Sequence, residues 1–246
     1  MKATGETIDP AEIARFAAHS ASWWDPAGSF RPLHRLNPAR LAFMRGELDA
    51  HFSRDPRSLA PFDGLTLCDV GCGGGLIAEP MARLGFQVTA IDADEEAIAI
   101  ARSHAASGGI EIDYRSETAE SLADNRRQFD VVLALEIVEH VAEPEAFLAA
   151  CGALVKPGGV FIGATLNRTP QSYALAIVGA EYVMRWLPRG THDWRRFLRP
   201  SEFVLGLRRA GLSATRLKGL RYRLGSGDWT LSDDLSVNYL VMAVKK

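Results

Sequence analysis

Two aspartates flank a run of glycines in a segment that has the pattern of a strand, a loop and a helix. Asp69 lies two residues before Gly71 in LTLCDVGCGGGLIAEPMARLG, and Asp92 ends the next apolar run, 21 residues after Gly71. Glycines such as Gly71 and Gly73 permit positive φ and let backbone N–H groups approach a ligand closely. A carboxylate in the place of Asp92 can accept two hydrogen bonds from a ribose diol. The pattern predicts a nucleoside-binding loop.

The charge of Asp69 separates two kinds of nucleoside cofactor. A carboxylate beside the glycines repels a pyrophosphate, whereas S-adenosylmethionine has no phosphate and carries two cationic groups, an ammonium and a sulfonium. Opposite charges a few Å apart at a partly buried site are worth on the order of a few kcal/mol. We expect Asp69 to face the methionine end of this cofactor and Asp92 its ribose. The structural alternative is that Asp69 caps the loop and Asp92 is the N-cap of the next helix.

The surrounding pattern predicts the sheet that positions these residues. Short apolar runs alternate with helical patterns, as in a doubly wound parallel sheet. We expect strands at 65–71, 87–92, 110–115, 131–135 and 160–165, followed by a helix from about 200 and strands at 212–218 and 237–244. The expected organisation is an N-terminal helical cap over residues 1–60 and an α/β domain over 61–246, with an insertion at 167–199.

Composition limits the class of protein. The chain has 246 residues, of which 47% are hydrophobic, enough for one α/β domain with a large core. Its 28 basic and 30 acidic residues give a net charge of −2, so there is no overall positive field to bind nucleic acid. Three cysteines without a CxxC pair favour a reducing compartment. The polar N-terminus and the absence of an apolar run of about 18 residues predict a cytoplasmic protein.

The core motifs together resemble the class I methyltransferase domain. They are DVGCGGG, AID, FDVVLALEIVEHV and LVKPGG, and they cover roughly residues 62–166. The resemblance implies a Rossmann-like α/β fold with helices on both faces of a seven-stranded, mostly parallel sheet whose last strand is antiparallel. It also implies that Leu135, with Glu136 beside it, lines the adenosine site. Glu117 and Glu120 in SETAESL fall where such enzymes often touch adenine, although solvated glutamates are the plainer interpretation.

The flanks resemble a narrower family, the ubiquinone-biosynthesis O-methyltransferases. The similar segments are SASWWDPAGSFRPLHRLNPAR at 20–40, TLNRTPQSYALAIVGAEYVMRWLPRGTHDWRRFLRPSE at 165–202, and DLSVNY near the C-terminus. This resemblance implies O-methylation of two phenolic substrates, a polyprenyl-hydroxyphenol (catechol) and a demethylated ubiquinol. It also implies that Arg40 contacts the cofactor together with Gly71, Asp92 and Leu135.

Arg40 and the two tryptophans suit a cationic amino-acid cofactor. The guanidinium of Arg40 can donate two parallel hydrogen bonds to the methionine carboxylate. The alternative is a surface arginine that caps a helix C-terminus. Trp23 and Trp24 can shield the sulfonium or the substrate ring, because aromatic faces attract cations. Their alternative role is ordinary packing of the N-terminal segment on the domain.

The EIVEH segment after the fourth strand offers proton or metal chemistry. On a helix, Glu136, Glu139 and His140 would share one face. They could bind a divalent cation such as Mg²⁺ that acidifies the catechol oxygens, or Glu136 or His140 could act as a metal-free general base. A purely structural role is the third alternative. His192, oriented by Asp193, is another base candidate, or simply a surface residue of its loop.

The insertion is both apolar and basic. Tyr173, Ile177, Ala180, Met184 and Leu187 follow one helical stripe, and six arginines against two acids lie between Arg168 and Arg199. This composition favours peripheral contact of 171–199 with anionic lipid on the inner face of the cytoplasmic membrane, where a polyprenyl tail resides. A lid over the pocket or a dimer face is the alternative. Partner enzymes of ubiquinone biosynthesis are a further expectation.

Three other functions compete with this interpretation. One is a methyltransferase for a different small molecule. Another is a nicotinamide-dependent oxidoreductase, against which Asp69, the lack of glycine at position 76 and the C-terminal strand pattern argue. The third is a non-enzymatic assembly factor that keeps the fold without turnover, which the intact glycine loop and acids disfavour.

Overall fold

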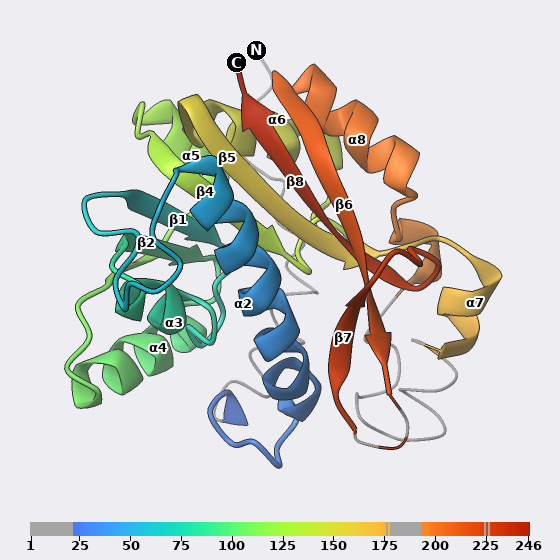
Figure 1. Ribbon diagram of the computed structural model, residues 1–246, viewed down its shortest axis with the longest axis horizontal. Coiled ribbons are helices and arrows are strands. Elements are labelled where there is room, and N and C mark those ends of the chain that lie inside the picture. The colour runs from blue at the N-terminus through green and yellow to red at the C-terminus, as the bar shows by residue number, and fades with distance from the viewer. Residues whose placement is uncertain (1–21, 176, 178–192, 224, 226) are drawn as a thin grey trace.

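The molecule is built around one mixed sheet (Figure 1). The computed structural model describes residues 22–175, 177, 193–223, 225 and 227–246. Within these residues, eight strands follow the order β3-β2-β1-β4-β5-β8-β6-β7. Their bounds are β1 Thr66–Val70, β2 Gln87–Asp92, β3 Asp113–Ser116, β4 Phe129–Leu135, β5 Val155–Leu166, β6 Leu212–Tyr222, β7 Trp229–Ser232 and β8 Asn238–Lys245.

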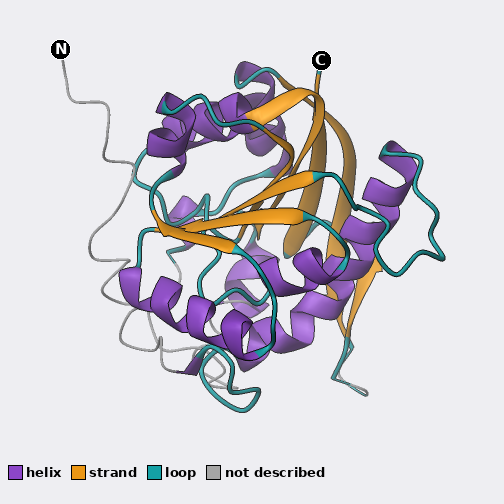
Figure 2. Ribbon diagram, turned by 90° about the vertical axis from the view of Figure 1, so that its left-hand side faces the viewer, coloured by secondary structure: helices purple, strands orange, loops and turns teal. Residues whose placement is uncertain are grey.

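Helices cover both faces of this sheet (Figure 2). Their bounds are α2 Arg31–His51, α3 Ala78–Arg83, α4 Glu95–Ser107, α5 Ala119–Asp124, α6 Pro144–Leu154, α7 Pro170–Ser172 and α8 Pro200–Arg209, with a short 3₁₀ turn at Trp194–Arg196. Residues of α2, α3 and α4 pack with one face of the sheet in a single hydrophobic cluster. Residues of α5, α6 and α8 pack with the other face. Because the central strands are covered on both sides, their sequences are continuous apolar runs rather than alternating ones.

The expected fold class is confirmed, with two additions. Strand β8 runs antiparallel between β5 and β6, as expected for the last strand of the sheet. The chain after β6 turns back through a hairpin, in which Arg223 N–H donates to the Asp228 carbonyl at 2.8 Å, and forms β7 at the sheet edge. The sheet of the described residues therefore has eight strands rather than the expected seven. The short helix α5 was also not expected.

The N-cap of helix α4 is Asp94 rather than Asp92. The Asp94 carboxylate accepts hydrogen bonds from the N–H groups of Glu96 and Ala97, which are otherwise unpaired donors of the first turn. The suggestion that Asp92 serves as the N-cap is therefore wrong. Asp92 is left at the end of β2 for another role.

The described part of the N-terminal segment shares its core with the sheet. Phe43, Met44 and Leu48 of α2 are buried in the same cluster as Leu67 and Leu133 of the central strands. The division into a cap over 1–60 and a domain over 61–246 remains a prediction, and residues 1–21 lie outside the described residues. Within the described segments, no helix has the length and apolar character needed to span a bilayer.

One exposed and one closely packed helical glycine allow the packing of the helices to be tested. A methyl group at Gly46 on the exposed side of α2 meets nothing within 4 Å, whereas at Gly152 in α6 it overlaps the Ala210 carbonyl. We expect Gly46→Ala to stabilise the fold by about 0.5–1 kcal/mol, because alanine loses less backbone entropy in a helix. Gly152→Ala should destabilise it by about 1–3 kcal/mol through overpacking. Urea unfolding measures both, and equal effects of the two substitutions would contradict the packing of α6 against the end of α8.

Candidate active site

The ends of three neighbouring strands bring the predicted site residues together. β1 lies between β2 and β4, with Asp69 in register with Ala90 on one side and Leu133 on the other. All three strands are parallel, so Gly71, Asp92 and Leu135 emerge at the same edge of the sheet. In the sheet, β2 and β3 lie on one side of β1, whereas β4 and β5 lie on the other. Open α/β sheets bind ligands at such a change in strand order.

The glycine loop is held against the end of β2. The N–H groups of Gly71 and Cys72 both donate to the Ile91 carbonyl, at 2.8 and 3.0 Å. Gly71 and Gly73 have φ values of 73° and 50°, a region that residues with a side chain rarely occupy. A Cβ at Gly71 would also overlap the side chain of Ile137. Backbone conformation and close packing therefore both require glycine here.

Asp69 is a buried carboxylate with an unused oxygen. The residue is 3% exposed, and its Oδ2 atom has no hydrogen-bond partner among the residues that the structure describes. Desolvation, and then the negative charge of Asp92, raises the pKa of Asp69 to about 7. Leaving a buried carboxylate oxygen unpaired is costly, so this atom needs a cationic or hydrogen-bonding partner.

Asp92 ties the glycine loop to the next strand. Its Oδ2 atom accepts from Gly73 N–H at 2.8 Å, and its Oδ1 atom accepts from Asp94 N–H at 2.9 Å. Desolvation raises its pKa above the ordinary aspartate value, while these two backbone hydrogen bonds oppose the rise. Each carboxylate oxygen has two lone pairs, so Asp92 can hold the loop and still accept from a ligand hydroxyl.

Arg40 reaches the same edge from helix α2. It is 2% exposed, so the alternative of a surface arginine at a helix terminus is wrong. Its Nη2 atom donates to Glu136 Oε1 at 2.5 Å, and Nη1 donates to Asn37 at 3.4 Å. Its Nε atom is buried and lacks a partner within the described part of the chain. The guanidinium therefore keeps donor capacity next to the end of β4.

The three residues of the EIVEH segment do not lie on a helix. Glu136 has φ 53°, an uncommon value for a residue with a side chain, and residues 138–140 form a turn. The expectation of a shared helical face is wrong, because this left-handed residue ends the strand and changes the direction of the chain. Among the described residues, no three His, Cys, Asp or Glu side chains are grouped as metal ligands.

Glu136 and Glu139 are nevertheless brought close to each other. Glu139 is 3% exposed, and its Oε2 atom accepts from the Thr165 hydroxyl at 3.0 Å. Its Oε1 atom finds no partner in the described segments. Desolvation, and then the negative charge of Glu136, raises the pKa of Glu139 well above the usual glutamate range. Arg40 balances the charge of Glu136, so Glu139 is the second uncompensated acid at the site, and half-buried His140 follows it in the turn.

The described N-terminal residues cover the glycine loop. A Cβ at Gly73 or Gly74 would overlap the indole of Trp23, which is 9% exposed. Trp24 Nε1 donates to the Gly74 carbonyl at 2.9 Å. The two tryptophans therefore contact the loop itself. Sequence reasoning missed these contacts because they join residues about 50 positions apart, with no local pattern to mark them.

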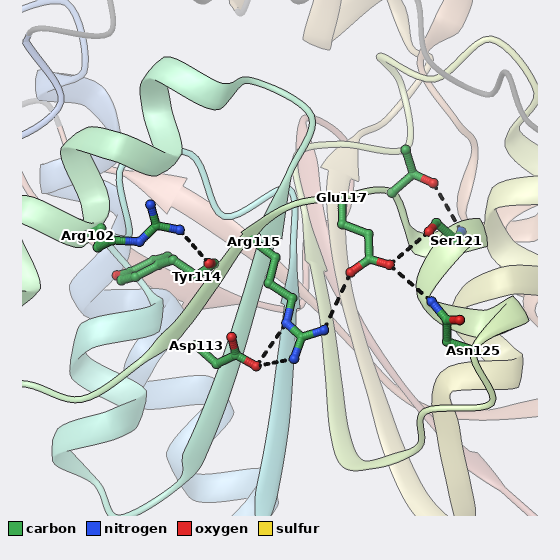
Figure 3. A network of polar contacts seen from close by, with 8 residues as sticks. Arg102, Asp113, Tyr114, Arg115, Glu117, Ser121 and Asn125 are labelled. Carbon is green, nitrogen blue, oxygen red and sulfur yellow. Dashed lines mark hydrogen bonds and ion pairs between the residues drawn. The ribbon is translucent and has the colours of Figure 1, made fainter.

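Glu117 belongs to a network of polar contacts beside the site (Figure 3). It accepts from the Ser121 hydroxyl at 2.8 Å and from Asn125 at 3.4 Å, and it pairs with Arg115 at 3.8 Å. These partners engage its carboxylate in holding α5 to the end of β3. Glu120 lies in the first turn of α5. His192 lies outside the described residues, so its predicted role stays a prediction.

Proteins of similar sequence decide the family. A relative from Paramagnetospirillum magneticum named ubiquinone biosynthesis O-methyltransferase is 55% identical over 97% of this chain and 96% of its own length. Another of that name, from Dinoroseobacter shibae, is 52% identical over 100% of this chain and 99% of its own. The chain belongs to the ubiquinone biosynthesis O-methyltransferases. A methyltransferase-domain family model matches residues 68–163 of this enzyme, which is an S-adenosylmethionine-dependent methyltransferase.

Solved structures share the fold of the enzyme. The magnesium protoporphyrin IX methyltransferase of Synechocystis, with bound S-adenosylmethionine, is 18% identical and has a TM-score of 0.63 over 99% of this chain and 100% of that one. A methyltransferase of Thermotoga maritima, described as a possible histamine N-methyltransferase, has a TM-score of 0.62 at 17% identity, over 96% and 99% of the two chains. At these identities the likeness is one of fold. It confirms the class I methyltransferase architecture.

Proposed function

We propose that the enzyme transfers a methyl group from S-adenosylmethionine to phenolic oxygens of polyprenylated intermediates, a catechol and a demethylubiquinol. The observation that carries this proposal is the extent of the similarity. Relatives with this family name match the segments before and after the methyltransferase domain as well as the domain itself. Those flanks supply Arg40 and the tryptophans at the glycine loop. A methyltransferase acting on an unrelated small molecule would not need to share them.

The buried acids of the loop are assigned to the cofactor. Asp69 would pair with the ammonium of S-adenosylmethionine, because its free Oδ2 atom needs a cationic partner. Asp92 would accept from the ribose hydroxyls, while the backbone of Gly71 and Gly73 lines the methionine end and Leu135 the adenosine. The spare donors of Arg40 suit the methionine carboxylate. These residues fit the cofactor in charge and in hydrogen-bonding capacity.

The reaction is an in-line displacement at the methyl carbon. A lone pair of the phenolate oxygen forms the new O–C bond. The electrons of the broken C–S bond return to sulfur, which becomes a neutral thioether. Phenols titrate near pH 10, so the substrate must lose its proton before or during transfer. In this proposal residues at the end of β4 receive the proton, and their position at the same sheet edge as the cofactor loop supports that role.

We propose that the Glu136–Glu139 pair, with His140 beside it, holds a divalent cation such as Mg²⁺. Carboxylate oxygens are the ligands that Mg²⁺ prefers, and the unpaired Oε1 atom of buried Glu139 supports a cation there. Bound at this place, the cation would lower the pKa of the catechol oxygens. Glu136, His140 or His192 acting alone as a general base is the competing mechanism.

Product analysis tests the function and the cation together. Purified enzyme, S-adenosylmethionine and a short-chain demethylubiquinol should give a product heavier by one methyl group in mass spectrometry. Exhaustive chelation should abolish turnover, Mg²⁺ should restore it, and Glu139→Gln should raise the Mg²⁺ concentration needed. A catechol without a prenyl tail is the matched substrate control. Full activity after chelation would remove the cation hypothesis and leave a general base, whereas no methylated quinol under either condition would remove the proposed substrate.

The raised pKa of Asp69 predicts how cofactor affinity depends on pH. Above about pH 7 the carboxylate is ionised and pairs directly with the ammonium, which stays protonated up to roughly pH 8. Below pH 7 Asp69 must first release a proton, so affinity should fall by up to about tenfold per pH unit. Calorimetric titration with S-adenosylmethionine from acid to neutral pH measures this slope.

Asp69→Asn is the matched control for this titration. The amide keeps the size of the side chain but cannot ionise, so its cofactor affinity should be weaker and nearly flat over the same pH range. A parent enzyme whose affinity is also flat would mean that Asp69 does not face the ammonium.

We further propose that the insertion contacts anionic lipid, which would place the enzyme at the inner face of the cytoplasmic membrane beside its substrates and other ubiquinone-biosynthesis enzymes. Tyr173 and Leu175 at the described edge of the insertion are 49% and 51% exposed. Ile177, expected on the same stripe, instead packs against Leu166 and Phe197. Ala180, Met184 and Leu187 lie outside the described residues.

Charge reversal tests the membrane contact. Flotation with anionic liposomes should recover the parent enzyme, and Arg185→Glu with Arg189→Glu should reduce that recovery several-fold. Arg57→Glu with Arg208→Glu reverses two exposed arginines elsewhere and is the matched control. Equal recovery of all three proteins would favour a lid or a dimer face for the insertion.

A further inference from the structure

A buried acid lies behind the glycine loop, outside the set assigned to the cofactor. Glu79 of α3 is 3% exposed, and its Oε1 atom accepts a hydrogen bond from His104 Nδ1 of α4 at 2.6 Å. An apolar residue would fill this position between two helices and the sheet without the cost of desolvating a carboxylate. A buried acid at this position therefore indicates a role for the histidine that it orients.

His104 stacks on Trp24, the tryptophan that is hydrogen-bonded to the glycine loop. Its ring lies parallel to that of Trp24, with centroids 3.4 Å apart and an interplanar angle of 4°. Trp24 in turn donates its indole N–H to the Gly74 carbonyl. A continuous series of contacts thus runs from Glu79 through His104 and Trp24 to the loop.

The same contacts fix the residues on either side of Trp24. Trp23 stacks on Phe30 with centroids 3.6 Å apart and lies against Gly73 and Gly74. His34 Nε2 donates to the Trp23 carbonyl at 2.8 Å, which ties the segment to α2. We call residues 22–30 the cap segment. Its described contacts hold it on the loop from the α4 side and from the α2 side.

We propose that Glu79, His104 and Trp24 form a latch that keeps the cap segment closed on the glycine loop and thereby sets how long S-adenosylmethionine stays bound. The inference rests on the proposed placement of the cofactor at this loop. The three are positioning residues, because none of them is assigned a contact with the reacting atoms. Trp24 makes the contact with the loop, His104 supports its ring, and Glu79 sets the orientation of His104.

Rapid displacement of bound S-adenosylmethionine by excess S-adenosylhomocysteine tests the latch in the full-length enzyme. Trp24→Phe keeps a stacking ring and removes the donor to Gly74, so the dissociation rate should rise about tenfold, the effect of losing one good hydrogen bond. His104→Phe keeps the stack and loses the bond to Glu79, and should act in the same direction. Glu79→Gln keeps an acceptor for His104 and should stay close to the parent.

The kinetic split separates a latch from a general loss of structure. KM for S-adenosylmethionine should rise with the dissociation rate, while kcat at saturating cofactor should stay within about twofold, because chemistry at the end of β4 is untouched. His51→Phe is the matched control, since His51 is a half-buried histidine of α2 that contacts the Gly158 carbonyl, far along the chain from the cap segment. Its rates should equal those of the parent.

Several outcomes would overturn the latch. One is unchanged dissociation in both Trp24→Phe and His104→Phe, and another is slower dissociation in either. A third is loss of folding in both, which would make these contacts purely structural. Thermal unfolding of each variant identifies the last case. If the parent enzyme itself does not bind S-adenosylmethionine, the proposed function fails; if it binds and the variants match it, the latch alone fails.

Discussion

Uncompensated negative charge at the end of the parallel strands is the constraint on which the site depends. Asp69 and Glu139 are almost fully buried, each has a carboxylate oxygen without a partner in the described residues, and each has a raised pKa. A fold tolerates such charge only where a cation or a proton completes it. In the proposed complex the ammonium group of the cofactor supplies that charge at Asp69, so binding would relieve the cost of a buried, unpaired carboxylate oxygen.

The sheet topology makes this concentration of acids unavoidable. Parallel neighbours end at the same edge, so Asp69, Asp92 and Glu136 lie along one edge of the sheet although they are far apart in sequence. Arg40 balances part of this negative charge, since its buried guanidinium pairs with Glu136 from the helix that precedes the sheet. The pairing explains why α2 is built into the core of the sheet: a buried arginine holds its partner only if its helix is fixed in place.

The sequence predicted the strands and the glycine loop, which depend on local composition. It did not predict contacts between residues far apart in the chain. The apolar runs and the glycines located β1, β2 and the loop to within a residue or two, because strand burial and positive φ constrain composition directly. The turn at Glu136 was mistaken for a helix, since the i, i+3, i+4 spacing of its acids and histidine suits both and only the left-handed φ decides. The ion pair of Arg40 with Glu136 spans 96 residues and follows no spacing rule.

The glycines of the loop satisfy two demands at once, and this couples the cofactor to the N-terminal segment. Their missing side chains let a ligand approach the backbone, but they also leave a bare surface that water can reach. Trp23 fills the space that a Cβ at Gly73 or Gly74 would occupy, and Trp24 uses the carbonyl that the bare loop presents. A side chain at either glycine would therefore displace the tryptophan as well as hinder the ligand. The loop and its aromatic cover form one unit, and neither can change without the other.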